Sequence, residues 1–247
     1  MKKFFIILFI PFLLLFSGCD IRDIFANDDI EISTLNYIST VVVNSNIKIT
    51  TSTTEILTHR QGLYEGSGSG FIFHQDDNTY YVLTNNHVIT LTDNERYKHN
   101  YTIEDNNNNS YDASLVTRFV EYDLAVLKFA TLNQLGVIQL SSTNPEIGEI
   151  VFSIGSPFGQ HNIITAGKVL DYRTIDNVDY EVILHNAIIR NGSSGSMLIN
   201  DKFEIVGINT WGFKSNKDDD EEFVIGGATP VENILECLHS FPLFEKI

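Results

Sequence analysis

Residues 190–200, RNGSSGSMLIN, place a serine between two glycines at the start of an apolar strand. Gly192 and Gly195 allow a sharp turn and a close approach of the backbone, because glycine adopts conformations that other residues avoid. The Ser194 hydroxyl would then be exposed, with neighbouring backbone N–H groups converging on an oxygen atom of a bound molecule. An isolated Gly/Ser cluster is most often an ordinary turn. This stretch therefore needs chemical partners elsewhere in the chain.

Two upstream stretches supply side chains that would activate a serine. In residues 80–89, YYVLTNNHVI, an apolar strand ends at two asparagines and His87, where a side chain can accept and return a proton. Residues 121–129, EYDLAVLKF, place Asp123 directly before a buried-looking strand, from which a carboxylate can orient an imidazole. A serine hydroxyl is a poor nucleophile near neutral pH and needs such a base and such an acid. His87, Asp123 and Ser194 are therefore candidate catalytic residues.

The order of these residues along the chain, His then Asp then Ser, is that of the chymotrypsin-like double β-barrel. The α/β-hydrolases use the order Ser, Asp or Glu, His, and a G-x-S-x-G motif whose second glycine is missing around Ser194. Short β-branched and aromatic runs between polar turns predict strands. These runs lie at residues 39–44, 46–50, 70–74, 80–84, 124–129, 149–154, 162–171, 181–184, 197–199, 204–211 and 223–225.

The pattern predicts an all-β fold of two barrels with a C-terminal helix. A turn-rich stretch at residues 141–148 divides the strands, so we expect the first barrel in residues 35–140 and the second barrel with the helix in residues 141–247. Pro230 can start the helix, because the apolar residues after it share one face at three- and four-residue spacing. The asparagine-rich residues 105–110 are expected to form a solvated loop.

The amino terminus has the pattern of an export signal. A short positive start precedes 13 apolar residues, 4–16, fewer than the roughly 20 that span a bilayer. Small residues before Cys19 resemble the lipobox of bacterial lipoproteins, and the alternative is an ordinary cleavage site with Cys19 as a bystander. We expect residues 1–18 to be a signal peptide and residues 19–34 a tether to a lipid on Cys19, so that the exported protein is anchored to a membrane in the cell envelope.

Composition and charge exclude several classes of function. The 247 residues include 43% hydrophobic residues, enough for a substantial core. The formal net charge of −16 becomes −18 once residues 1–18, with two lysines and no acidic residue, are removed. Such a charge repels phosphate backbones, so we expect no nucleic-acid partner. No CxxC or HExxH spacing indicates a metal, and we expect no cofactor. A lipidated Cys19 would leave Cys237 without a disulfide partner, buried under the helix.

The chain resembles the trypsin-like serine proteases of the bacterial HtrA (Deg) type. The resemblance spans roughly residues 37–233, and it rests on successive motifs in the family's order: GSGSGFIF, YYVLTNNHVI, YDLAVLKF, IGEIVFSIGSPFG, IITAGKVL, RNGSSGSMLIN, VGINTWGF and GGATP. It implies a serine endopeptidase that cleaves protein or peptide substrates through an acyl-enzyme intermediate. Processing or quality control of envelope or surface proteins is the implied role.

The resemblance assigns roles to matching residues. His87 would be the general base and acid, Asp123 its orienting carboxylate and Ser194 the nucleophile. The backbone N–H groups of Gly192 and Ser194 would form the oxyanion hole. The implied substrate-binding residues are Ile188, Asn209, Thr210, Trp211 and Gly212, of which the last four would pair with the substrate backbone.

Departures from the family pattern bear on specificity and regulation. Ser196 replaces a glycine, as in the glutamyl endopeptidases of this fold, but Asn209 stands where those enzymes bind glutamate with a histidine, which argues against glutamate specificity. Ser193 stands where digestive zymogens of this fold carry an aspartate, so a salt bridge to a newly cleaved amino terminus cannot activate the enzyme. Ile188 predicts an apolar pocket for small or medium aliphatic P1 residues, the residues before the scissile bond. The residues after Asn233 are too few for the PDZ domain that usually follows.

Two other hypotheses stay open. One is a catalytically silent relative that acts as a binding module, and the other is a toxin- or adhesin-like protease of narrow specificity. The presence of the complete triad and of both oxyanion-loop positions favours an active enzyme. Many proteases of the HtrA type are homo-oligomers, and the sequence leaves this point open as well.

Overall fold

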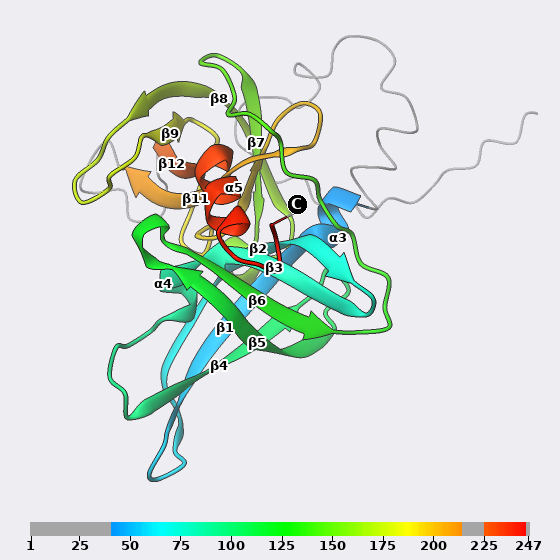
Figure 1. The fold of residues 1–247 in the computed structure, drawn as a ribbon, viewed down its shortest axis with the longest axis vertical. Helices are drawn as coiled ribbons and strands as arrows, with labels where there is room; N and C mark the ends of the chain where they lie inside the picture. The colour runs from blue at the N-terminus through cyan, green and yellow to red at the C-terminus, as the bar shows by residue number, and fades with distance from the viewer. Residues whose placement is uncertain (1–40, 214–224, 246–247) are drawn as a thin grey trace, which may run out of the picture. The chain divides into compact units, whose positions relative to one another are not determined.

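The structure, a computed structural model, describes residues 41–213 and 225–245. It contains two closed antiparallel β-barrels of six strands each, followed by a short C-terminal helix (Figure 1). The predicted all-β double barrel is therefore confirmed. The predicted signal peptide, Cys19 and the tether lie outside the described residues. Within residues 41–213 and 225–245, none of the helices combines the length and hydropathy that a bilayer span requires.

The first barrel has the strand order β1-β2-β3-β6-β5-β4. Along β1 the residues Ile47, Ile49, Thr51 and Thr53 are buried at every second position, as a strand with one face towards a core requires. The strands are β1 (Asn46–Glu55), β2 (Gln61–Asp76), β3 (Thr79–Asn85), β4 (Tyr97–Glu104), β5 (Ser110–Phe119) and β6 (Leu124–Ala130).

The second barrel has the strand order β10-β11-β12-β9-β8-β7. Its core contains the buried side chains of Val151, Val169, Ile183, Leu198 and Val206. The strands are β7 (Ile150–Gly155), β8 (Ile163–Arg173), β9 (Val182–His185), β10 (Met197–Ile199), β11 (Ile205–Phe213) and β12 (Ile225–Pro230). The predicted division between residues 140 and 141 lies in the connection between β6 and β7 and stays a prediction.

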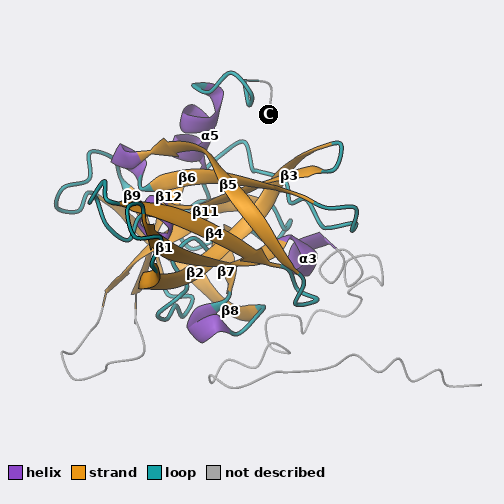
Figure 2. Ribbon diagram, turned by 90° about the horizontal axis from the view of Figure 1, so that it is seen from below, coloured by secondary structure: helices purple, strands orange, loops and turns teal. Residues whose placement is uncertain are grey.

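Helical segments are short and lie before, between or after the strands. Figure 2 shows far more strand than helix in the described chain, and the last helix lies outside the barrels. These segments are α3 (Val43–Ser45), α4 (Asn86–Ile89), the 3₁₀ turns η2 (Val120–Tyr122) and η3 (Pro157–Gly159), and α5 (Val231–His239). As predicted, α5 begins directly after Pro230, and Cys237 is buried on it.

Some elements differ from the sequence predictions. The strand predicted at residues 39–44 is wrong for its described part, because residues 41–45 are helical. There the Gly136 N–H donates to the Asn44 C=O (3.3 Å), so this segment packs against the chain after β6, which overrides the strand preference of its valines. The strands β4 and β5 were not predicted, because both are polar and neither has a fully buried face. The loop expected at residues 105–110 connects these two strands.

The C-terminal segment joins the two barrels. The helix α5 packs on β11 and β12 of the second barrel. After it the chain turns towards the first barrel, where the fully buried ring of Phe244 lies 5.3 Å from that of Phe73 and 5.4 Å from that of Tyr81 (centroid distances). The neighbouring Leu243 is 47% exposed. Phe244 therefore anchors the end of the chain to the β2–β3 hairpin.

Replacing Phe244 with alanine should lower the free energy of unfolding by about 3–5 kcal/mol, because it empties a fully buried aromatic site. Leu243→Ala is the matched control and should change stability by less than about 1 kcal/mol, since this side chain is half exposed. Urea unfolding of both variants measures the difference. Equal stabilities of the two variants would show that the segment does not hold the barrels together.

Candidate active site

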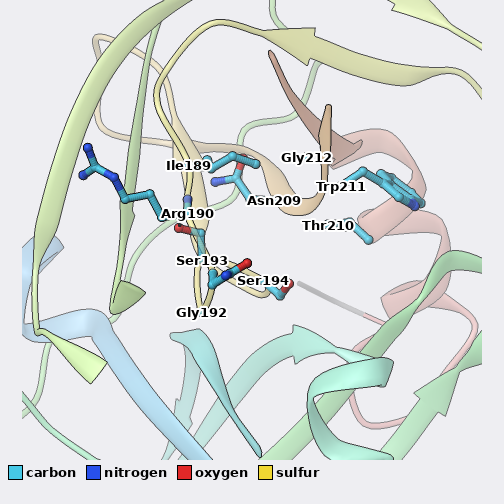
Figure 3. Close-up of a pocket in the computed structure, with 10 residues that line it drawn as sticks. Ile189, Arg190, Gly192, Ser193, Ser194, Asn209, Thr210, Trp211 and Gly212 are labelled. Atoms are coloured by element: carbon cyan, nitrogen blue, oxygen red, sulfur yellow. Dashed lines mark hydrogen bonds between the residues drawn. The ribbon is translucent and has the colours of Figure 1, made fainter. Parts of the chain in front are cut away.

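A cavity of about 210 Å³ lies between residues 189–194 and residues 209–212, which supply all of its lining. The first segment precedes β10 and the second belongs to β11. In Figure 3 the side chain of Ile189 lies beside that of Asn209, whereas Arg190 points away from the other lining residues. Ser194 therefore stands at the edge of a hollow that can receive a side chain.

His87 is held by Asp123 through two contacts. One carboxylate oxygen of Asp123 lies 2.5 Å from His87 Nδ1, and the other accepts the His87 backbone N–H at 2.9 Å. Because the carboxylate accepts a proton-bearing Nδ1, the neutral ring carries its lone pair on Nε2. The imidazole is 49% exposed, so that Nε2 can reach a reacting group. His87 is therefore oriented as a base.

Asp123 keeps its position through its own backbone. It follows η2 with φ 51°, a left-handed conformation that aspartate tolerates better than most residues. Its C=O accepts the Asn86 N–H at 2.9 Å and the Asn85 side-chain amide at 3.0 Å. The same amide donates to the Thr210 hydroxyl at 3.0 Å. Asn85, whose role the sequence did not reveal, thus links the acid to the strand beside the cavity.

The loop that carries Ser194 contacts the first barrel directly. The Ser69 N–H donates to the Ser194 C=O at 2.8 Å. A Cβ added to Gly68 would lie 2.7 Å from Val88 Cγ2 and 3.1 Å from the Ser194 C=O oxygen, so the residue after His87 and the serine meet at this glycine. Gly195 has φ +83°, and a Cβ there would lie 2.1 Å from the Ser69 C=O oxygen. Only glycine fits these two close approaches.

A type II β-turn precedes Ser194. The Ser193 N–H donates to the Arg190 C=O at 2.8 Å, and Gly192 is the one residue of this turn with a positive φ, +91°. The Asn191 C=O accepts the Phe158 N–H at 3.0 Å. Because the N–H and C=O of a trans peptide point in opposite directions, the Gly192 N–H faces away from Phe158. It makes no hydrogen bond within the described chain and is free to bind a substrate oxygen.

Serine side chains fix this turn further. The Ser69 hydroxyl donates to the Gly192 C=O at 2.8 Å and accepts the Ser156 N–H at 2.8 Å. The Ser193 hydroxyl accepts the Arg190 N–H at 3.0 Å. Ser193, which stands where trypsin-like zymogens carry an aspartate, thus closes the turn locally. Hydrogen bonds from both barrels therefore hold this turn.

Asn209, which lines the cavity, belongs to a buried polar network. His185 Nε2 lies 2.8 Å from the Asn209 amide oxygen, and the Asn209 amide nitrogen donates to the hydroxyls of Ser153 at 3.0 Å and Ser196 at 2.9 Å. Burial lowers the pKa of His185 to about 4, partly offset by its bond to Asn209. Ser196 therefore serves to hold Asn209. The sequence pattern did not indicate His185, because its partner lies on another strand.

Four of the five predicted substrate-binding residues line the cavity. Asn209, Thr210, Trp211 and Gly212 all line the cavity, whereas Ile188 does not, and its neighbour Ile189 does. The Ile188 C=O instead accepts the Thr165 hydroxyl at 2.7 Å. Beyond residue 209, β11 pairs with β12 alone within the described chain, so its other edge is open to an extended peptide.

The chain is similar to known serine proteases. The model of the trypsin-like peptidase domain matches residues 68–208. Serine protease HTRA1 of Xenopus laevis is 36% identical over 151 residues, which cover 58% of this chain and 31% of that protein. A probable periplasmic serine endoprotease, DegP-like, of Pseudomonas fulva is 35% identical over 154 residues, 61% of this chain and 30% of that protein. The chain thus spans about a third of the length of these relatives.

A solved structure supports the fold. The HtrA-type protease AlgWS227A with tripeptide aligns with a TM-score of 0.67 and 26% identity, covering 83% of this chain and 62% of that one. The double barrel is therefore chymotrypsin-like, as the order of the candidate residues predicts.

The low pKa of His185 should appear in the pH dependence of stability. The folded protein keeps His185 neutral down to about pH 4, whereas in the unfolded chain the side chain takes up the proton near the ordinary histidine pKa of about 6.5. The stabilisation is thus complete above pH 6.5 and is lost as the pH falls towards 4. Urea unfolding between pH 6.5 and 4 should show that the free energy of unfolding falls more steeply with decreasing pH in the wild type than in His185→Gln. Equal slopes would contradict the assignment, and His59→Gln, at an exposed histidine, is the control.

Proposed function

The chain belongs to the trypsin-like peptidase family, and from this premise we propose that it is a serine endopeptidase with His87, Asp123 and Ser194 as its catalytic residues. Its homologues are HtrA-type serine endopeptidases. The observation that carries the proposal is the orientation of the Asn191–Gly192 peptide, whose C=O is bound by Phe158 outside the cavity. A catalytically silent binding module would not need the Gly192 N–H to be free of hydrogen bonds.

The proposed reaction assigns one step to each of these residues. The Ser194 oxygen attacks the scissile carbonyl carbon while His87 Nε2 takes the hydroxyl proton. The negative charge that develops on the carbonyl oxygen is stabilised by the Gly192 and Ser194 N–H groups. His87 then gives the proton to the leaving amine, and an acyl-enzyme remains on Ser194. Water, activated by His87, hydrolyses this ester and restores the enzyme. Asp123 stabilises the transient imidazolium throughout.

The cavity supports an aliphatic P1 preference. Ile189 forms part of its wall. The Asn209 amide already has partners for both its oxygen and its nitrogen, so it offers little to a charged side chain. We therefore propose small or medium aliphatic P1 residues, with Ile188 as a contributor beyond the lined cavity. The edge of β11 from Asn209 to Gly212 would pair with the peptide backbone.

Location and assembly are also proposals. An apolar start and the small residues before Cys19 support export and lipid anchoring in the cell envelope, and a relative is named as a periplasmic endoprotease. Processing or quality control of envelope proteins is the proposed role, with narrow, toxin- or adhesin-like specificity as the alternative. Homo-oligomer formation is a further possibility that the family resemblance suggests.

Kinetics of variants test the proposed chemistry. Ser194→Ala should abolish cleavage of an unfolded protein substrate. Gly192→Ala should lower kcat by about 10²- to 10³-fold with KM nearly unchanged, because the strained turn would displace one oxyanion donor, the backbone N–H of residue 192. An added Cβ would strain φ +91° and lie 3.1 Å from the Phe158 nitrogen. Cleavage that survives Ser194→Ala would contradict the proposal.

The specificity proposal has its own test. A peptide library with varied P1 residues should be cleaved fastest after Ala, Val, Ile or Leu, because Ile189 lines the cavity and the Arg190 side chain points away from the other lining residues. Mass spectrometry of the products identifies the cleaved bonds. A strong preference for Lys, Arg or Glu at P1 would overturn this assignment without affecting the triad.

A further inference from the structure

The connection between β7 and β8 holds the turn before Ser194 and is itself held by the first barrel. Phe158, at the centre of this connection, donates its N–H to the Asn191 C=O at 3.0 Å. Any movement of Phe158 therefore acts on the peptide whose N–H serves the oxyanion hole. What fixes residues 156–162 consequently decides whether that donor stays in place.

This connection is strained. Phe158 has φ +52°, a left-handed conformation that a bulky residue rarely adopts, whereas Asn162, at φ +57°, is of a type that tolerates it. The conformation of Phe158 is unfavourable and persists only where surrounding contacts enforce it. The loop therefore needs partners outside itself.

Side chains of the first barrel bind both ends of the loop. At its start, the buried Asn46 amide nitrogen donates to the Ser156 hydroxyl at 3.3 Å. At its end, the same amide donates to the Asn162 side-chain oxygen at 3.0 Å. The Asn162 amide in turn donates to the Asn106 side chain, in the turn after β4. Asn46, on β1, thus spans the loop from one end to the other.

An acid–base pair completes this attachment. His161 Nε2 lies 2.6 Å from a carboxylate oxygen of Glu104, the last residue of β4, and Lys48 Nζ lies 3.4 Å from the same oxygen. The hydrogen bond from His161, aided by Lys48, lowers the pKa of Glu104 despite its partial burial. The carboxylate is therefore ionised near neutral pH, and the bond from His161 is a strong, charge-assisted one. The His161 side chain is only 15% exposed.

We propose that His161 and Glu104 are positioning residues of the oxyanion hole, acting through the loop 156–162 and the Phe158 N–H on the Asn191–Gly192 peptide. The inference rests on the proposed peptidase function. Together with Asn46, Asn106 and Asn162, these two residues form an inter-barrel clamp. The clamp replaces the buried salt bridge that Ser193, in place of an aspartate, rules out.

The matched variants are His161→Leu, which removes the donor to Glu104, and His161→Gln, which retains a donor of similar reach. The control is Asp171→Asn, which breaks the exposed ion pair of Arg173 with Asp171 on β8 (2.7 Å), away from the loop. We expect His161→Leu to lower kcat roughly 10- to 100-fold with KM unchanged, because a small misplacement of a catalytic group has effects of this size. His161→Gln should keep most of the activity, and Asp171→Asn all of it.

A double-mutant cycle separates positioning from general loss of structure. In the Gly192→Ala background, where the hole is already impaired, His161→Leu should reduce kcat little further, since both changes act on the same peptide. A full, multiplicative loss there would overturn the proposal, as would a rise in KM alone or an equal loss in Asp171→Asn. Should His161→Leu fail to fold, Glu104→Gln is read by the same criteria.

Hydrogen exchange gives a readout that does not depend on activity. The Phe158 amide should exchange faster in His161→Leu than in the wild type, because its bond to Asn191 opens more often. Unchanged exchange would contradict the clamp. If the wild-type chain cleaves nothing, the proposed function fails, while the exchange measurement still decides whether the clamp holds the turn.

Discussion

The orientation of one peptide unit, between Asn191 and Gly192, is the constraint on which the site depends. In a planar trans peptide the N–H and the C=O point in opposite directions, so a contact that binds the C=O on one side fixes the N–H on the other. Phe158 binds that C=O, and glycine at the next position accepts the positive φ that a type II turn demands. The opposite orientation would direct a carbonyl oxygen into the hole, where it would repel the developing negative charge. The hydrogen bonds of the Ser69 and Ser193 hydroxyls to this turn hold the peptide in the observed orientation.

The proposed catalytic site is divided between the barrels, so the proposed chemistry depends on their contact. The first barrel supplies His87 and Asp123, and the second supplies Ser194 with its turn. Ser69 connects them at the loop that carries Ser194, and Asn85 connects the acid to Thr210 on the substrate strand. The buried ring of Phe244 fastens the end of the second barrel to the first. A catalytic group displaced at this junction would lose its partner on the other barrel.

The sequence predicted those features whose signals are local. A window of about ten residues is enough to show the glycines that flank Ser194. A window of the same size shows the apolar strand that ends just before His87. The strands β4 and β5 do not stand out in the sequence, because many of their own side chains are polar. Residues 41–45 have the pattern of a strand but are helical, because the segment they pack against lies after β6. Bonds such as His161 to Glu104, 57 residues apart, or Asn85 to Thr210, 125 apart, join positions that no local pattern relates.

The most direct test of the central claim is covalent labelling of the untreated full chain with a peptidyl phosphonate, followed by peptide mapping. A base-activated serine beside a formed oxyanion hole should react with one equivalent of reagent, at Ser194 alone, without prior proteolysis or an added activator. Parallel labelling of His87→Ala should be slower by orders of magnitude, because the serine then lacks its base. Labelling that is absent from the folded wild type, or that occurs at another residue, would contradict the account.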